Sequence, residues 1–262
     1  MSDFGVRYWF EPEKLIQFKE MDQKLRNNIW SLFYNAFKSE KWLLQNIIEN
    51  YYFEPIDNYY RYMGERYFST EDALSFIKNN ILYWTISDVC WLLEFIAATR
   101  ANWFQDIYNS IFKRHKFGWM FIDKKLVPIT DENEIKSIET SLDLLSSIPW
   151  ARIHIKTAID HLSDRDNPDY RNSVKESVSA VESVANYINW TDSDTLWKAI
   201  KKLWIHKALE GAFSQLYWYT SDADWIRHFM LEESTLDFAD AKYMLVSCSA
   251  FINYLIQKFP NT

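Results

Sequence analysis

The chain has 262 residues, of which 48% are hydrophobic and 25% charged, and 29 Lys and Arg against 36 Asp and Glu give a formal net charge of −7. This composition is typical of a globular protein with one large or two modest domains. It excludes a disordered chain, a collagen-like chain and a disulfide scaffold. The acidic balance argues against non-specific coating of nucleic acid, but it leaves room for a local basic groove.

The distribution of apolar residues and the glycine content narrow the class of protein further. No run of about 18 apolar residues occurs, and the first residues lack a basic stretch followed by an apolar one. We therefore expect a cytoplasmic protein with no membrane partner. The chain has only 4 glycines but 13 tryptophans. Few glycines predict few hairpins and few turns with positive φ, which an all-α protein tolerates.

Helical periodicity dominates the first part of the chain. Apolar residues recur at helical spacing, and we expect no strand before residue 116. The predicted helices cover 21–37, 42–52, 73–83, 86–98 and 103–113. Ser69 and Thr70, followed by acidic residues, are typical of the start of the third helix.

The pattern changes between residues 116 and 130. Segments 117–122 and 125–129, joined by Asp123 and Lys124, predict a two-stranded hairpin. An isolated hairpin is marginally stable in water, so we expect this one to pack on helices. A helix is predicted over 135–145, and Pro149 marks the junction to a second unit.

The rest of the chain is predicted to be a helical bundle. Its helices cover 151–163, 170–188, 196–203, 207–216 and 237–259, with a cap at 192–194 and a polar loop at 220–228. The short loops favour antiparallel neighbours. We therefore expect an all-α fold: an N-terminal helical domain over 1–146 with a small hairpin near 117–129, and an antiparallel bundle over 147–262.

Several kinds of site are excluded by the residues present. The four glycines, at 5, 64, 118 and 211, allow no phosphate-binding glycine loop, and the histidines show no metal-ligand spacing. A nucleophile elbow is also missing. His154 and His161 lie seven residues apart on one helix face. They are either co-ligands of a metal or, as we favour, satisfied structural residues, one on a partly wet helix face and the other near the helix end. We expect no metal and no cofactor.

A dense polar group precedes the last helix and holds the strongest candidates for chemistry. It contains Ser221, Asp222, Asp224, Arg227 and His228. A histidine acts as a general acid or base near neutrality, and an arginine holds a phosphate, which is what metal-independent RNA cleavage requires because the ribose 2′-hydroxyl is the nucleophile. The alternative is structural: the two aspartates cap a short helix and Arg227 bonds them.

A basic stripe lies close to this group in the sequence. It contains Lys201, Lys202 and Lys207. These lysines either neutralise a nucleic-acid backbone or form an ordinary solvated helix face. The many aromatic residues either stack on bases or, as their spacing favours for most of them, fill the core.

Four stretches resemble, in the right order, the AbiJ N-terminal domain type 4 family of prokaryotic conflict-system proteins. The matching stretches are EMDQKLRNNIW at 20–30, FIDKKLVPIT at 121–130, NPDYRNSVKES at 167–177, and DADWIRH at 222–228 followed by YMLVSCSAF at 243–251. This resemblance implies an abortive-infection antiviral protein whose C-terminal bundle is HEPN-like (higher eukaryotes and prokaryotes nucleotide-binding). Active members of that superfamily are metal-independent RNA endonucleases with an arginine and a histidine several residues apart.

The resemblance also suggests site residues and partners. Arg227 would hold the scissile phosphate and His228 would act as acid or base, in a composite site made by a homodimer. Glu176 and Lys175 are the expected polar partners. Here, however, Arg227 and His228 are adjacent, which departs from the superfamily pattern. The alternative function is a non-catalytic sensor or interaction module for a protein, nucleotide or RNA, and a nucleotide-binding bundle without hydrolysis is a third.

Tryptophan also stands where relatives tend to have glycine. Trp197, Trp218 and Trp225 occupy such places, and 217–222 is expected to be a turn that glycine would suit. We hypothesise that the gene comes from an organism that reads UGA as glycine and that these tryptophans are a translation artefact.

Overall fold

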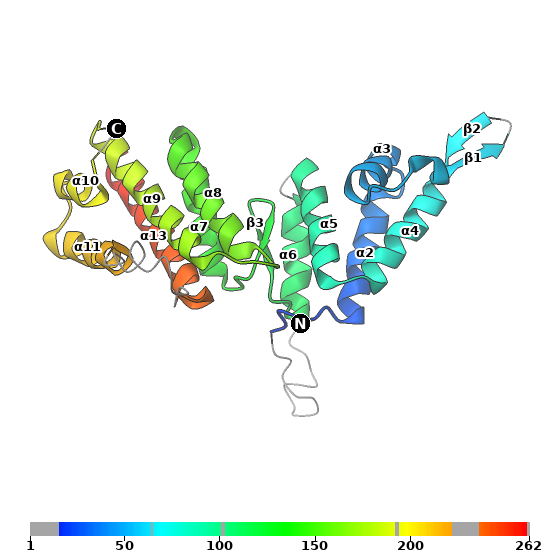
Figure 1. The fold of residues 1–262 in the computed structure, drawn as a ribbon, viewed down its shortest axis with the longest axis horizontal. Coiled ribbons are helices and arrows are strands. Elements are labelled where there is room, and N and C mark those ends of the chain that lie inside the picture. The colour runs from blue at the N-terminus through cyan, green and yellow to red at the C-terminus, as the bar shows by residue number, and fades with distance from the viewer. Residues whose placement is uncertain (1–15, 64, 101–102, 192–193, 222–235, 261–262) are drawn as a thin grey trace, which may run out of the picture. The chain divides into compact units, whose positions relative to one another are not determined.

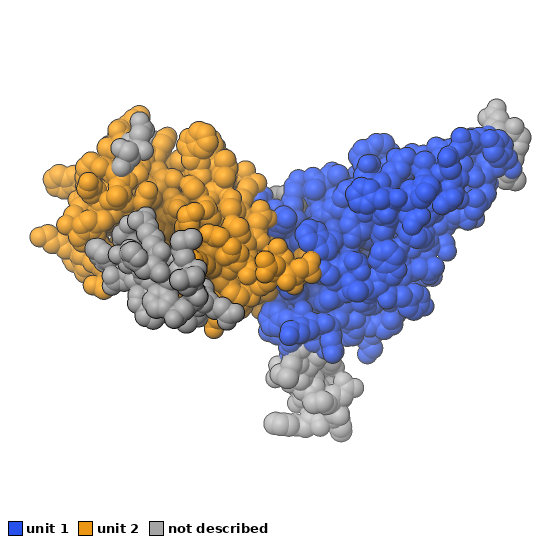
Figure 2. Space-filling view, viewed as in Figure 1, with its two compact units in different colours: residues 1–126 blue, residues 127–262 orange. Residues whose placement is uncertain are grey.

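The computed structural model describes residues 16–63, 65–100, 103–191, 194–221 and 236–260. These residues are mostly helical and include two small two-stranded sheets, so the expected all-α class is confirmed (Figure 1). The chain divides into two compact units, residues 1–126 and 127–262, coloured separately in Figure 2. The division falls inside the second hairpin.

Unit 1 contains the helices that periodicity predicted, with ends set by local sequence. Asp22, Ser69 and Thr85 are the N-caps of three of them, and each side chain accepts a hydrogen bond from the amide three residues on. The elements are α2 (Gln23–Phe37), α3 (Lys41–Asn46) continued by the π-helix η1 (Ile47–Tyr51), the 3-10 turn η2 (Ile56–Tyr59), α4 (Thr70–Tyr83), α5 (Ile86–Thr99) and α6 (Trp103–His115).

One hairpin of unit 1 was not predicted. Strands β1 (Tyr60–Met63) and β2 (Glu65–Phe68) pair antiparallel, with Tyr60 opposite Phe68, so the expectation of no strand before residue 116 is wrong. The Tyr60 and Phe68 rings meet at 5.9 Å between centroids. Such aromatic cross-strand pairs stabilise strands that are too short to show a period of two.

The predicted hairpin is present but shorter than expected, as β3 (Met120–Ile122) and β4 (Lys125–Val127). Side chains of α5 and α6 hold it. Asn109 bonds both the N–H (2.7 Å) and the carbonyl (3.1 Å) of Phe121, and the Glu94 carboxylate accepts from the N–H of Leu126 at 2.8 Å. The expectation that this hairpin packs on helices is confirmed, because helical side chains replace the missing neighbouring strands.

Phenylalanine and tryptophan side chains differ sharply in burial. The largest fully buried side chains of the described part of the chain are phenylalanines, all of them in unit 1: Phe33, Phe37, Phe104, Phe112, Phe117 and Phe121. None of the ten tryptophan side chains that the structure describes is buried. The expectation that most aromatics fill the core therefore holds for these phenylalanines and is wrong for tryptophan.

Unit 2 contains the predicted bundle helices. They are α7 (Glu132–Leu144) with the 3-10 turn η3 (Leu145–Ser147), α8 (Pro149–Ser163), α9 (Tyr170–Ile188), α10 (Leu196–Lys202), α11 (Lys207–Ser221) and α13 (Phe238–Lys258). The expected antiparallel arrangement is confirmed for α8 and α9: the Asp169 N–H bonds the His161 carbonyl, and further along Ser173 bonds the Ala158 carbonyl. The core between α8, α9 and α13 is mainly alanine, valine, isoleucine and leucine.

The first helix of unit 2 bears on the domain boundary. α7 packs against α13, and the Lys242 ammonium of α13 lies 3.0 Å from the Glu134 carboxylate of α7. The compact unit therefore begins before α7. The domain boundary that the sequence predicts between residues 146 and 147 stays a prediction.

Two local expectations in unit 2 are wrong. α11 continues through Ser221, so Thr220 and Ser221 belong to a helix and not to a polar loop or turn, because no glycine or proline interrupts 212–221. The N-cap of α10 is Thr195, whereas the neighbouring Asp194 pairs with Lys202. Asp192 and Ser193, also expected to cap this helix, lie outside the described residues.

Three further findings concern chemistry and location. Within the described ranges, no helix has the length and apolar character needed to cross a bilayer. The same residues contain no group of three or more His, Cys, Asp or Glu arranged to hold a metal ion. Cys90 and Cys248 are buried and are not joined in a disulfide, and burial raises the pKa of Cys248 to about 12. Both side chains behave as small apolar groups.

Candidate functional site

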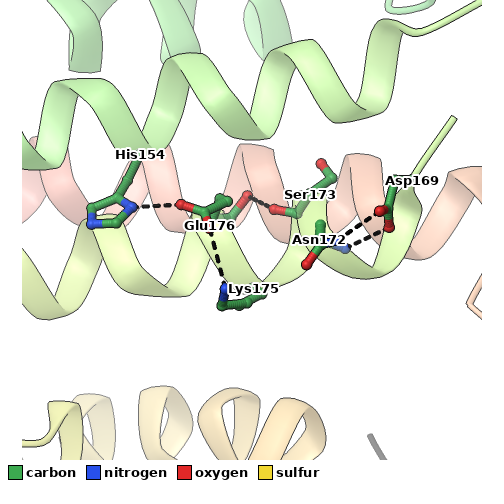
Figure 3. Close-up of polar contacts among 7 residues, drawn as sticks. His154, Asp169, Asn172, Ser173, Lys175 and Glu176 are labelled. Atoms are coloured by element: carbon green, nitrogen blue, oxygen red, sulfur yellow. Dashed lines mark hydrogen bonds and ion pairs between the residues drawn. The ribbon is translucent and has the colours of Figure 1, made fainter. Parts of the chain in front are cut away.

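The antiparallel pair α8–α9 brings an imidazole and a carboxylate together. The Nδ1 atom of His154 on α8 lies 2.6 Å from Oε2 of Glu176 on α9, as Figure 3 shows. The Glu176 side chain is 14% exposed and that of His154 34% exposed. A carboxylate only accepts hydrogen bonds, so Nδ1 carries a proton, and Nε2 is an acceptor whenever the ring is in its neutral form.

A cation borders this pair. The Lys175 ammonium lies 3.5 Å from Oε1 of Glu176, so the two carboxylate oxygens serve different partners. Lys175 is exposed, and in Figure 3 it points away from α8. An exposed pair of this kind adds little to stability. The group of His154, Glu176 and Lys175, hereafter the dyad site, therefore has at its edge an exposed cation that is only weakly held by its ion pair.

The start of α9 fixes the helix that carries the dyad site. Asp169 is its N-cap and accepts from both the backbone and the side chain of Asn172, at 2.9 and 2.6 Å. Burial raises the pKa of Asp169, but these hydrogen bonds outweigh it and leave the pKa below its usual value. One turn on, the buried Ser173 hydroxyl donates to the Ala158 carbonyl at 2.8 Å, tying α9 to α8. Register between the two helices, and hence the distance from His154 to Glu176, is fixed here.

The basic stripe lies elsewhere on the bundle. Lys201 stands over the Trp197 ring at 3.9 Å, Lys202 pairs with Asp194, and Lys207 begins α11. The hydrogen bond from Lys202 holds the pKa of Asp194 below its usual value.

α10, which carries most of the stripe, packs on the C-terminal half of α9. Asn189 donates to the Ala199 carbonyl, and Glu182 accepts from the Leu196 N–H. These contacts lie roughly 10–20 Å along α9 from Glu176, at 1.5 Å per residue. The stripe and the dyad site are thus separate features of unit 2.

The remaining candidates from the sequence lie beyond what the structure describes. Asp222, Asp224, Arg227 and His228 fall outside the described residues, as does the side chain of Ser221. Of the predicted site residues, the structure brings Glu176 and Lys175 together and adds His154, which sequence reasoning took for a satisfied structural residue on a partly wet helix face. A signal was present: with antiparallel helices joined by the loop 164–169, residues 154 and 176 fall at the same level.

Comparison with known proteins concerns mainly the N-terminal half. The model of the family AbiJ N-terminal domain 4 matches residues 3–144, which is more than half of the chain. No curated protein and no solved structure matches the chain. The match includes α7 and so runs past the compact unit 1. The chain belongs to the AbiJ N-terminal domain 4 family, which indicates a defence protein of the abortive-infection type.

Proposed function

We propose that this protein defends a prokaryotic cell from the cytoplasm against infection by binding RNA and cutting it without a metal, through a HEPN-like bundle in unit 2. The observation that carries the proposal is the dyad site, in which Glu176 holds the Nδ1–H of His154 and Lys175 stands beside them. An imidazole whose tautomer is fixed by a carboxylate is a general base, and an adjacent cation attracts phosphate.

The chemistry uses the nucleophile of the RNA itself. Nε2 of a histidine takes the proton of the ribose 2′-hydroxyl, and the oxygen attacks the adjacent phosphorus. The bond to the 5′-oxygen breaks, and that oxygen receives a proton from a second acid. The products are a 2′,3′-cyclic phosphate and a 5′-hydroxyl end. Cationic groups stabilise the negative charge on the phosphorane oxygens as the transition state forms.

The roles follow from these requirements. His154 and His228 are the two acid–base groups, and Glu176 is a positioning residue that acts through His154. Arg227 holds the scissile phosphate. The RNA next to that phosphate is bound by Ser221, Asp222 and Asp224. The stripe Lys201, Lys202 and Lys207 neutralises more distant phosphates. A homodimer supplies two copies of the Arg227–His228 pair to one composite site.

The second candidate function is a non-catalytic sensor or interaction module that recognises a partner protein, nucleotide or RNA. The adjacency of Arg227 and His228 favours it, because neighbouring helical residues point about 100° apart and do not converge on one phosphate without a loop or helix end. In this reading the dyad site binds an anion and moves no proton.

The test incubates the purified full chain with total tRNA and ribosomal RNA in EDTA and follows the fragments on a gel. We expect cleavage by the wild type and a loss of about 100-fold or more in His154→Gln and His228→Ala, the usual contribution of a general acid or base. His161→Gln is the matched control, since His161 is on the same helix seven residues away from the dyad site. A substrate with 2′-deoxyribose at the cut site should stay intact.

Two results decide against the nuclease. Equal cleavage by wild type, His154→Gln and His228→Ala would assign the activity to a contaminant. Wild-type protein that binds RNA in a filter or gel-shift assay but leaves it intact would establish the sensor function.

A further inference from the structure

The end of α9 has a backbone conformation that suits glycine and holds a tryptophan. Asn189 is the C-cap of the helix, and Trp190 follows with φ of 55°. The Trp190 N–H bonds the Tyr187 carbonyl at 3.2 Å, and the Thr191 N–H bonds the Asn186 carbonyl at 3.0 Å. These two bonds form a Schellman motif, whose left-handed position is usually glycine because a Cβ atom is disfavoured there. A bulky residue at positive φ is a genuine outlier.

The indole of Trp190 does little to offset this cost. Its side chain is 79% exposed, and its ring contact is with Tyr187 of the preceding turn, at 6.4 Å between centroids. Tryptophan ordinarily buries most of its large surface. The helix end therefore dictates the conformation of residue 190, and the side chain contributes almost nothing to it.

Across the described residues, Trp190 is the one tryptophan at a position with positive φ, but it is not the one residue there. Non-glycine residues occupy five described positions with positive φ: Phe53, Lys116, Asp123, Lys124 and Trp190. The two described glycines whose surroundings are known, Gly118 and Gly211, have no such φ. Seven of the ten described tryptophan side chains are exposed. Glycine is thus scarce where the backbone calls for it, and tryptophan is abundant where no core needs it.

We infer that residue 190 of the natural protein is glycine, encoded by a UGA codon that the organism reads as glycine and that has been translated as tryptophan. The inference does not extend to every tryptophan. Trp30 stacks on Phe33 at 5.8 Å, and the indole N–H of Trp119 donates to the Phe18 carbonyl at 2.9 Å. These two side chains form contacts that a glycine could not form, so we expect both to be true tryptophans encoded by UGG.

This assignment changes which surface is available to a ligand. With glycine at position 190, unit 2 loses one of its exposed indoles. Trp150 and Trp204 are candidates for the same replacement by glycine, because they too are more than 70% exposed. If all three are glycine, no indole at these positions is present for RNA bases to stack on. RNA binding would rest on the lysines and on the dyad site.

Gene sequence gives the direct test. We expect UGA at codon 190 and UGG at codons 30 and 119, and UGG at codon 190 would overturn the inference. Some organisms read UGA as tryptophan, so the second measurement is the mass of the peptide that contains residue 190, from protein made in its own host. A peptide mass that corresponds to tryptophan at position 190 would also overturn the inference.

Stability supplies a test that needs only recombinant protein. We expect Trp190→Gly to shift the unfolding equilibrium of unit 2 toward the folded state by about tenfold, since a left-handed conformation costs L residues roughly that factor. Tyr243→Gly is the matched control: Tyr243 is 57% exposed in the same unit, but it lies in α13, where glycine destabilises a helix. If Trp190→Gly were no more stable than the protein with tryptophan at position 190, the inference would be contradicted.

Discussion

The two units bury different polar groups, and the difference bears on where we propose the site. Unit 1 buries a carboxylate and carboxamides, Glu94, Asn80 and Gln105, and unit 2 buries only serines among its described polar residues. Glu94 and Gln105 are each bonded to a backbone N–H of the β3–β4 hairpin. These two buried side chains of unit 1 thus hold its own backbone.

Unit 2 uses its polar residues differently. Its buried Ser173 and Ser177 hydroxyls donate to helix carbonyls, which joins helices without charge. The ionisable residues of the dyad site lie at the surface, where they contact one another instead of the backbone. A site that binds and transforms a ligand needs titratable groups within reach of solvent, and of these two arrangements only the dyad site supplies them.

The largest expected effect tests the aromatic core of unit 1. Phe121→Ala should lower the free energy of unfolding by about 3–5 kcal/mol, because Phe121 is fully buried against Phe104 and Phe112. Hydrogen exchange should show the loss in the 120–127 hairpin, and Leu245→Ala in unit 2 is the control that should leave that hairpin protected. Equal loss of protection in α8 and α9 would show that the units do not unfold separately.

A smaller effect tests whether the buried carboxylate serves the backbone. Glu94→Ala leaves the Leu126 N–H without its partner and should cost about 2 kcal/mol, measured by urea unfolding. Glu94→Gln keeps an acceptor oxygen and should cost less than about half of that. If the two variants were equally unstable, the charge itself, and not the hydrogen bond, would be what unit 1 requires.

The smallest effect concerns acid and unit 2. The pKa of Asp169 is below its usual value of 3.8 in the folded protein, so its contribution is present above that value and is lost as the pH falls below it. Solvent limits the loss to under about 1 kcal/mol. The protection factors of the first-turn amides of α9, corrected for the intrinsic pH dependence of exchange, should fall on acidification in the wild type and much less in Asp169→Asn, which caps without titrating. An identical acid response in both would assign the effect to another group.

Sequence alone determined most of the helices and several of their ends. The 3.6-residue period placed α2, α5, α8 and α9, and Ser69, predicted at the start of the third helix, is the N-cap of α4. These features depend on residues within one turn of each other, so they can be read along the chain. The β3–β4 hairpin was also predicted, with its position right and its length overestimated.

Tertiary structure decided the features that join distant residues. The β1–β2 hairpin depends on cross-strand pairs, and the partners of Glu94 lie 32 residues away. His154 and Glu176 are 22 residues apart, and only the register of α8 against α9 makes them a pair. Periodicity tells which face of a helix is buried but not which residue of the neighbouring helix it meets. For this reason the sequence named Glu176 and Lys175, and the fold added His154.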